Sequence, residues 1–254
     1  MLSQTTPRGL ASTAQLLQPE AFSALRAAHV AVIGLGGVGS WAAEALGRSG
    51  VGRLTLVDFD HVAESNLNRQ VQATTRNLGQ AKTEALRDRL AIVAPHTEVQ
   101  GFDAFLTPEN AAEIRSCGAH FFIDACDDVA AKTALVLQFS NKQRPRALVV
   151  CGAAGGKRDP TRVAYGDLAE TSHDPLLAKL RYGLRRGYGF PREGRLLVPV
   201  VYSAESVQRP IGGAAAGRPG SALACAGYGS IVTVTAAMGM AAAARALHWI
   251  TRSS

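Results

Sequence analysis

The fold is decided by one short stretch, residues 30–39, which reads Val30-Ala31-Val32-Ile33-Gly34-Leu35-Gly36-Gly37-Val38-Gly39. Four apolar, mostly β-branched residues are typical of a buried strand, and a G-x-G-x-x-G pattern follows them directly. Residues 40–48 have a helical composition and are followed by glycines at 50 and 52, and residues 54–57 form a second apolar run that ends at Asp58. This order of strand, glycine turn, helix and strand predicts a βαβ unit.

The glycine turn predicts a nucleotide-binding site. Gly34, Gly36, Gly37 and Gly39 allow a tight turn whose backbone N–H groups approach phosphate oxygens, and the following helix points its positive N-terminus at the anion. Asp58, at the end of the next strand, can accept hydrogen bonds from ribose hydroxyls. NAD and ATP share this geometry, so residues further along the chain must decide between them. The alternative is a glycine-rich turn that packs without a ligand.

The rest of the chain alternates between strand and helix patterns, which predicts an α/β fold: a Rossmann-like, doubly wound, mostly parallel sheet with a C-terminal extension. Residues 1–20 are expected to form a loose N-terminal arm and residues 21–254 a single domain. A Pro-, Gly- and Ala-rich stretch near 208–220 predicts a mobile loop. The expected helices are 80–94, 108–116, 129–142 and 175–186, and the expected strands are 98–102, 120–123, 146–150 and 195–204.

The composition of the chain indicates which cellular compartment and which kinds of binding partner to expect. The net charge of +7 favours polyanionic partners such as tRNA, although an arginine-rich soluble enzyme would have the same charge. The four cysteines form no C-x-x-C pair, which argues against a structural zinc site. Because no secretory segment is recognisable, we expect a reducing compartment and a cytoplasmic protein.

Residues 228–250 are apolar and long enough to span a bilayer. They are, however, rich in Ala and Gly and are interrupted by Thr233 and Thr235. We therefore expect a buried strand followed by a helix, and no membrane contact.

Three stretches beyond the glycine loop favour an ATP-binding site over a NAD-binding site. They are residues 58–70 (DFDHVAESNLNRQ), residues 79–82 (GQAK) and residues 123–128 (IDACDD). Taken together with the glycine loop, they resemble the ubiquitin-activating-enzyme superfamily, which includes the bacterial ThiF and MoeB adenylyltransferases. The resemblance implies a single ATP-binding adenylation domain over residues 21–254 that uses ATP and Mg²⁺.

The chemistry of adenylation explains this set of residues. Arg69 and Lys82 can neutralise the triphosphate, Asp127 can hold the magnesium ion that bridges phosphate oxygens, and Asn66 can position ribose or phosphate. Arg69, Lys82 and Asp127 are therefore the candidate catalytic residues. Taken singly, the two cations would be surface charges and Asp127 the N-cap of the following helix. A NAD-dependent dehydrogenase would instead need a proton donor beside the nicotinamide.

A closer resemblance is to the bacterial tRNA threonylcarbamoyladenosine dehydratases. It rests on residues 34–46 (GLGGVGSWAAEAL), 66–70, 167–169 (DLA), 174–181 (DPLLAKLR), 202–205 (YSAE) and 227–239. The implied reaction is ATP-dependent cyclisation of the threonylcarbamoyl side chain on a modified adenosine beside the tRNA anticodon. The threonyl carboxylate is adenylated, and a nitrogen of the same side chain then displaces AMP.

A basic region near 175–195 fits a tRNA substrate. Its candidate tRNA-binding residues are Lys179, Arg181, Arg185 and Arg186, with aromatic residues interleaved that can stack on bases. The alternative is a solvated amphipathic helix.

The family resemblance also implies a homodimer and raises two further points. Related enzymes extend an N-terminal arginine into the partner subunit's ATP site, whereas this chain has Gln15 at that place and Arg8 nearby. Cys225 precedes a Gly-aromatic-Gly turn and is a candidate thiol, with a small packed cysteine as the alternative.

Two other functions remain open from the sequence. One is an adenylyltransferase that acts on the C-terminus of a ubiquitin-like sulfur-carrier protein, with a sulfur-transfer protein as partner. The other is a tRNA-binding module that has lost catalysis.

Overall fold

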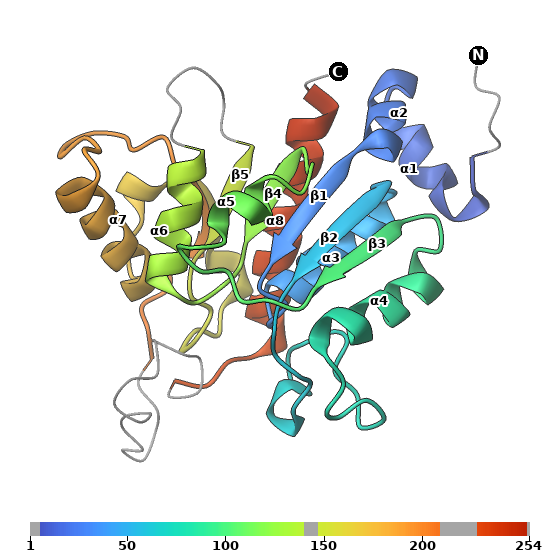
Figure 1. The fold of residues 1–254 in the computed structure, drawn as a ribbon, viewed down its shortest axis with the longest axis horizontal. Helices are drawn as coiled ribbons and strands as arrows, with labels where there is room; N and C mark the ends of the chain where they lie inside the picture. Colours follow the sequence, from blue (N-terminus) through green and yellow to red (C-terminus); the bar gives the residue numbers. More distant parts are fainter. Residues whose placement is uncertain (1–5, 140–146, 209–227, 253–254) are drawn as a thin grey trace.

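The sheet has seven strands among the described residues, and six of them run parallel. The computed structural model describes residues 6–139, 147–208 and 228–252, and its strand order is β3-β2-β1-β4-β5-β7-β6 (Figure 1). The edge strand β6 is antiparallel to β7. The strands are β1 (His29–Ile33), β2 (Arg53–Val57), β3 (Glu98–Phe102), β4 (Phe121–Asp124), β5 (Leu148–Cys151), β6 (Val163–Asp167) and β7 (Pro199–Ser203). The predicted α/β, doubly wound, mostly parallel sheet is confirmed.

Helices cover both faces of this sheet (Figure 1). The α-helices are α1 (Ala11–Leu16), α2 (Pro19–Ala27), α3 (Gly39–Ser49), α4 (Lys82–Val93), α5 (Ala111–Arg115), α6 (Val129–Gln138), α7 (Pro175–Gly187) and α8 (Val232–Arg252). Short 3-10 turns are η1 (Arg8–Leu10), η2 (Glu64–Asn66), η3 (Pro160–Arg162) and η4 (Leu168–Glu170).

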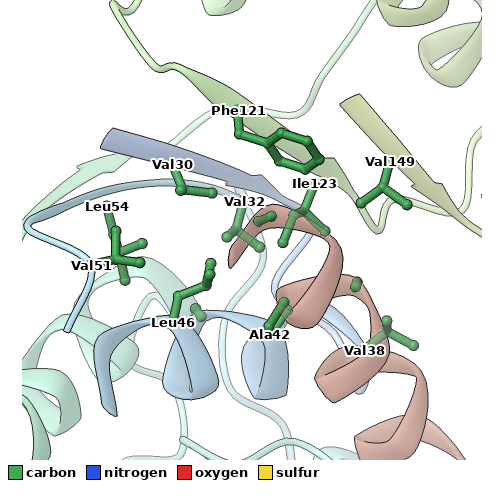
Figure 2. Packing of buried hydrophobic residues seen from close by; sticks show 14 of the residues in the cluster. Val30, Val32, Val38, Ala42, Leu46, Val51, Leu54, Phe121, Ile123 and Val149 are labelled. Atoms are coloured by element: carbon green, nitrogen blue, oxygen red, sulfur yellow. The ribbon is translucent and has the colours of Figure 1, made fainter. Parts of the chain in front are cut away.

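Strand β1 divides the core into two layers, because successive side chains of a strand point to opposite faces. Val30 and Val32 pack in a cluster with residues of α2, α3, α4 and α8, part of which Figure 2 shows. Ala31 and Ile33 pack on the other face, with residues of α5, α6 and α7. All five residues of β1 are buried, as expected for a central parallel strand.

The C-terminal segment differs from the prediction of a strand followed by a helix. From Val232 to Arg252 the chain is one continuous helix, α8. The β-branched residues at its start suggested a strand, but a buried stripe that begins at Val234 recurs with helical spacing along α8. Gly239 lets α8 approach α3 closely, since a Cβ there would meet Trp41 Cβ at 2.8 Å. Among the described residues, no helix has both the length and the apolar character needed to cross a bilayer.

The N-terminal segment is more ordered than the predicted loose arm. From Arg8 onward it forms η1 and α1, and Leu10 is completely buried. The Leu10 side chain lies against the helix C-cap at Gly50, whose own Cβ would come within 3.0 Å of Leu10 Cδ1. The sequence did not predict this order because the segment is mostly polar and is held by a single fully buried residue, Leu10.

The strand order places the carboxyl ends of β1 and β4 side by side. From β1 the chain continues through α3 to β2 and β3 on one side, whereas β4 begins the other half of the sheet. Such a topological switch point is where open α/β sheets bind their ligands.

We predict that Leu10→Ala destabilises the protein by about 2–5 kcal/mol, because it empties a fully buried site that the core cannot refill. The measurement is urea-induced unfolding. Leu16→Ala is the matched control, since Leu16 is 83% exposed, and it should change stability by less than about 0.5 kcal/mol. Equal effects of the two variants would show that Leu10 does not anchor the segment.

Candidate active site

The glycine loop fits its surroundings so tightly that two of its glycines leave no room for a side chain. Gly34 has a φ of +82°, which glycine adopts without strain, and a Cβ there would lie 2.7 Å from Cys126 N. A Cβ on Gly39 would collide with the carbonyl oxygen of Gly34. Gly36 differs, because no described atom lies within 4 Å of the place its Cβ would take. Contacts with the described residues therefore do not explain glycine at this position, whereas close approach of a ligand would.

Asp58 ties the glycine loop to the end of β2. Its Oδ2 accepts a hydrogen bond from Leu35 N at 2.6 Å, and its Oδ1 accepts one from Asp60 N at 2.8 Å. Asp58 is buried, yet a carboxylate offers about four acceptor positions, so the two oxygens retain capacity for a ligand. The predicted ribose acid thus lies at the loop and also shapes it.

Arg69 lies against the glycine loop. Its Cγ would be 3.2 Å from a Cβ on Gly37, and Trp41 Nε1 of α3 donates to its backbone carbonyl at 3.0 Å. The guanidinium donates to Ser65 O at 2.6 Å and to Asn68 Oδ1 at 2.9 Å. These partners are exposed and uncharged, so they orient the cation without neutralising it.

Asn66 and Lys82 are buried beside the end of β2. Asn66 Oδ1 accepts from Ala63 N at 3.0 Å and so closes the turn that carries Arg69. Lys82 is the first residue of α4, and its Nζ pairs with Asp60 Oδ2 at 2.7 Å. The Lys82 side chain is only 7% exposed whereas that of Asp60 is 54% exposed, so the pair joins a buried cation to a solvated carboxylate.

Asp127 follows β4, opposite the glycine loop, and its side chain is exposed without a hydrogen bond or ion pair to any described residue. The N-cap of α6 is Asp128, whose Oδ1 accepts from Ala131 N at 2.7 Å. The structure thus rules out the alternative role of Asp127 as the helix cap and leaves its carboxylate without a partner among the described residues.

A buried ion pair fixes the segment that carries Asp127. Lys132 Nζ lies 3.0 Å from Asp124 Oδ1, and both side chains are fully buried. The same oxygen accepts from the Cys126 N–H at 3.2 Å and from Cys126 Sγ at 3.0 Å. Burial disfavours the charge of Lys132, but the Asp124 carboxylate outweighs it and raises the pKa of the ammonium. The sequence alone does not reveal this pair, since Lys132 has the position of an ordinary residue of the predicted helix.

The cysteines near this pair are not activated nucleophiles. Burial and the Asp124 charge raise the pKa of the Cys126 thiol well above its usual range, and burial raises the pKa of Cys151 to about 12. Both stay protonated near neutral pH. Cys225, the candidate thiol, lies outside the described residues, as do residues 209–220 of the predicted loop.

The four candidate tRNA-binding residues of α7 do not share one role. Arg181 donates to the carbonyls of Leu168 and Thr171 at 3.0 Å each, and Arg185 donates to the carbonyls of Pro191 and Gly194. Lys179 and Arg186 are exposed, and the Arg186 guanidinium lies 5.8 Å from the Tyr182 ring centre. None of them joins the residues around the glycine loop.

An exposed aromatic pair beside Asp58 was missed from the sequence. The Phe59 and Phe105 rings lie 5.3 Å apart at the carboxyl ends of β2 and β3, and both residues are more than half exposed. Exposed aromatic rings beside a ribose acid can contact a nucleotide base. The missed signal was the phenylalanine directly after Asp58, in a loop where a polar residue is expected.

The chain matches a known family over most of its length. A model of the ThiF family matches residues 10–254. The tRNA threonylcarbamoyladenosine dehydratase of Escherichia coli is 39% identical, and the match covers 97% of this chain and 95% of that protein. Crystal structures of the E. coli dehydratase in complex with ATP and with AMP superpose with a TM-score of 0.86 at 38% identity, again over 97% and 95% of the two chains.

A second relative is similar over a smaller part. The molybdopterin-synthase adenylyltransferase of Salmonella typhimurium is 40% identical over 46% of each chain. Matches along almost the full length of the dehydratases, and along less than half of the adenylyltransferase, place this chain in the ThiF family and, within it, among the tRNA threonylcarbamoyladenosine dehydratases.

Proposed function

We infer that this chain uses ATP to dehydrate threonylcarbamoyladenosine in tRNA and closes its side chain into a ring. The observation that carries the inference is that the loop with Gly36 and the segment with Asp127 follow two neighbouring strands, β1 and β4, at the switch point of the sheet. The family match along 97% of the chain supplies the substrate class. The sulfur-carrier alternative has support over less than half of the chain.

In this reaction a threonyl carboxylate oxygen attacks the α-phosphorus of ATP, and the bond to pyrophosphate breaks. A nitrogen of the same side chain then attacks the activated carbonyl, loses its proton and expels AMP. The glycine loop with Gly34, Gly36, Gly37 and Gly39 would hold the phosphates, and Asp58 and Asn66 the ribose end. Arg69 and Lys82 would stabilise the charge that develops on the phosphates.

Asp127 fits the role of a magnesium ligand. It is an exposed carboxylate without another partner among the described residues, which contain no cluster of three or more metal-ligating side chains. This matches the usual mode of Mg²⁺, which binds through one or two carboxylates, substrate phosphates and water. When bound, the ion would neutralise the phosphates and make pyrophosphate a better leaving group.

The exposed cations of α7 would contact the tRNA backbone. Lys179 and Arg186 are exposed on the helix, and the exposed Tyr182 ring beside Arg186 can stack on a base. Arg181 and Arg185 already bind backbone carbonyls, so we assign them a supporting role at this surface.

We further propose that the protein acts in the cytoplasm as a homodimer, in which exposed Arg8 of one subunit is the candidate for reaching the partner subunit's ATP site. A sulfur-transfer protein remains a proposed partner. Light scattering tests the dimer, and a monomer at micromolar concentration would exclude it.

The test of the function is mass spectrometry of tRNA nucleosides after incubation with ATP, Mg²⁺ and this protein. We expect loss of one water from threonylcarbamoyladenosine, together with one AMP per product. Salt-dependent tRNA binding without AMP formation would instead indicate a binding module that has lost catalysis.

We predict that Asp127→Asn lowers turnover by about a hundredfold, because a neutral amide is a poor ligand for a hard dication and the phosphate charge is less stabilised. The unfolding temperature should not change, since Asp128 caps α6. Asp128→Asn is the matched control and should keep normal turnover, because Asn also caps helices. Near-normal turnover of Asp127→Asn, measured over a range of Mg²⁺ concentrations, would disprove the metal role.

We predict that the double change Lys179→Ala and Arg186→Ala weakens tRNA binding while ATP affinity stays the same. The slope of log affinity against log salt should become shallower by about 0.7–0.9 for each tRNA phosphate that the variant no longer neutralises. Arg76→Ala with Arg87→Ala removes the same charge from exposed positions at and before α4, at the opposite end of the molecule (Figure 1). If this control weakens tRNA binding equally, the effect is one of net charge and α7 is not the tRNA surface.

A further inference from the structure

A cavity of about 400 Å³ lies at the start of α7, outside the ATP site described above. Its walls include His173, Pro175, Ala178, Arg181 and Val207. Neither His173 nor Val207 belongs to the ATP site, and the cavity is large enough to take a nucleobase.

The inner wall of this cavity is built on the carboxyl ends of β5 and β7. Asp174 Oδ2 accepts from Ala153 N, just after β5, at 2.9 Å. The buried Lys157 ammonium binds the carbonyls of His173 at 3.0 Å and of Ser203, the last residue of β7, at 2.6 Å. Neighbouring strands lie about 4.8 Å apart, so these ends are about one and two strands from the end of β4. The inner wall of the cavity therefore lies one to two strands from the end of β4, which Asp127 follows.

The cavity also adjoins the basic surface of α7. A second hollow, of about 510 Å³, is lined by Tyr182, Arg185, Arg186 and Arg192. Ala178 and Arg181 line both hollows, so the basic surface and the cavity form one path. A nucleic acid bound along α7 could place one nucleotide in the cavity without leaving the basic surface.

The cavity has polar groups that can bind a base, and its Asp174 carboxylate already accepts two backbone hydrogen bonds. One ring nitrogen of His173, Nδ1, lies 3.3 Å from Ser206 Oγ, and its other ring nitrogen has no partner among the described residues. The Asp174 carboxylate is occupied by the N–H groups of Ala153 and Leu177. Pro175 and Val207 add apolar surface. A hydrogen-bonding nucleoside suits this lining, because the cavity offers a ring nitrogen of His173, the Arg181 side chain and apolar walls.

We propose that this cavity binds the threonylcarbamoyl-modified nucleoside itself, turned out of the tRNA loop, while its carboxylate points along the sheet edge toward Asp127. This rests on the proposed function. Sequence-specific RNA recognition usually targets unstacked bases of single-stranded loops, and enzymes that modify a base commonly take it out of the stack.

The experiment compares two variants of the cavity with the wild-type protein. Ser172→Phe fills the cavity from an exposed position that does not line the basic hollow. His173→Asn removes the imidazole but keeps a residue that tolerates the left-handed backbone of His173, whose φ is +55°. Ser23→Phe, an equally exposed serine on α2, is the matched control. Affinities are measured for ATP and for one tRNA with and without the threonylcarbamoyl group.

We expect the wild type to prefer the modified tRNA, and each cavity variant to lose about tenfold of that preference, the size of one altered contact in a fitted pocket. Affinity for ATP and for the unmodified tRNA should stay the same in all variants, and Ser23→Phe should behave as wild type.

Three outcomes would overturn the assignment. In the first, both cavity variants keep the wild-type preference for the modified tRNA. In the second, the cavity variants lose affinity for the modified and the unmodified tRNA to the same extent. In the third, the wild type binds the two tRNAs with equal affinity. Absence of ATP-dependent dehydration by the wild type would instead disprove the proposed function, and the binding comparison would still decide whether the cavity reads the modified nucleoside.

Discussion

The backbone of Ala125 and Cys126 lies so close to Gly34 that not even a methyl group fits between them. This approach joins the loop after β1 to the segment after β4, the two places at which the halves of the sheet separate. Because Gly34 also needs a positive φ, any other residue would strain the loop and push the segment away. The position of the segment that carries Asp127 relative to the glycine loop depends on this one contact.

The buried Asp124–Lys132 pair holds the other side of that contact. A buried ion pair does not necessarily add stability, because both charges lose their water, yet removing one partner costs about 3–5 kcal/mol. Asp124 Oδ1 accepts from Lys132 and from both Cys126 N and Sγ, whereas Oδ2 is buried without a partner among the described residues. An apolar core could fill the same space, but it would not bind the Cys126 N–H. We therefore see the pair as fixing the conformation of residues 125–128 more than as a source of stability.

The sequence predicted the parallel sheet and the glycine loop because both follow from local patterns: short apolar runs that end in Gly34 or Asp58. The sequence did not predict the two terminal segments, whose conformation depends on contacts with residues far away in the chain. Leu10 orders the first helix by packing on Gly50, and α8 is helical from its start because its small residues meet α3. The same dependence on structure limits the prediction of the site. Asp127 and Asp128 cannot be told apart in the sequence, and only the hydrogen bond from Ala131 N to Asp128 identifies which of them caps α6.

The cations of α7 differ in their contacts, which the sequence could not show, since two of its arginines bind backbone carbonyls of neighbouring turns. Arg181 binds Leu168 O and Thr171 O, and Arg185 binds Pro191 O and Gly194 O. These bonds fix the loops on either side of the helix, and they shape the hollows that Arg181 lines. The cations of α7 thus fall into two groups: Arg181 and Arg185 hold the neighbouring loops, whereas Lys179 and Arg186 are exposed and are the two that we propose contact tRNA. The start of α7 is joined to the sheet at the ends of β5 and β7, whereas the glycine loop follows β1, so the proposed tRNA surface and the proposed ATP site would reach a common edge of the sheet from different sides.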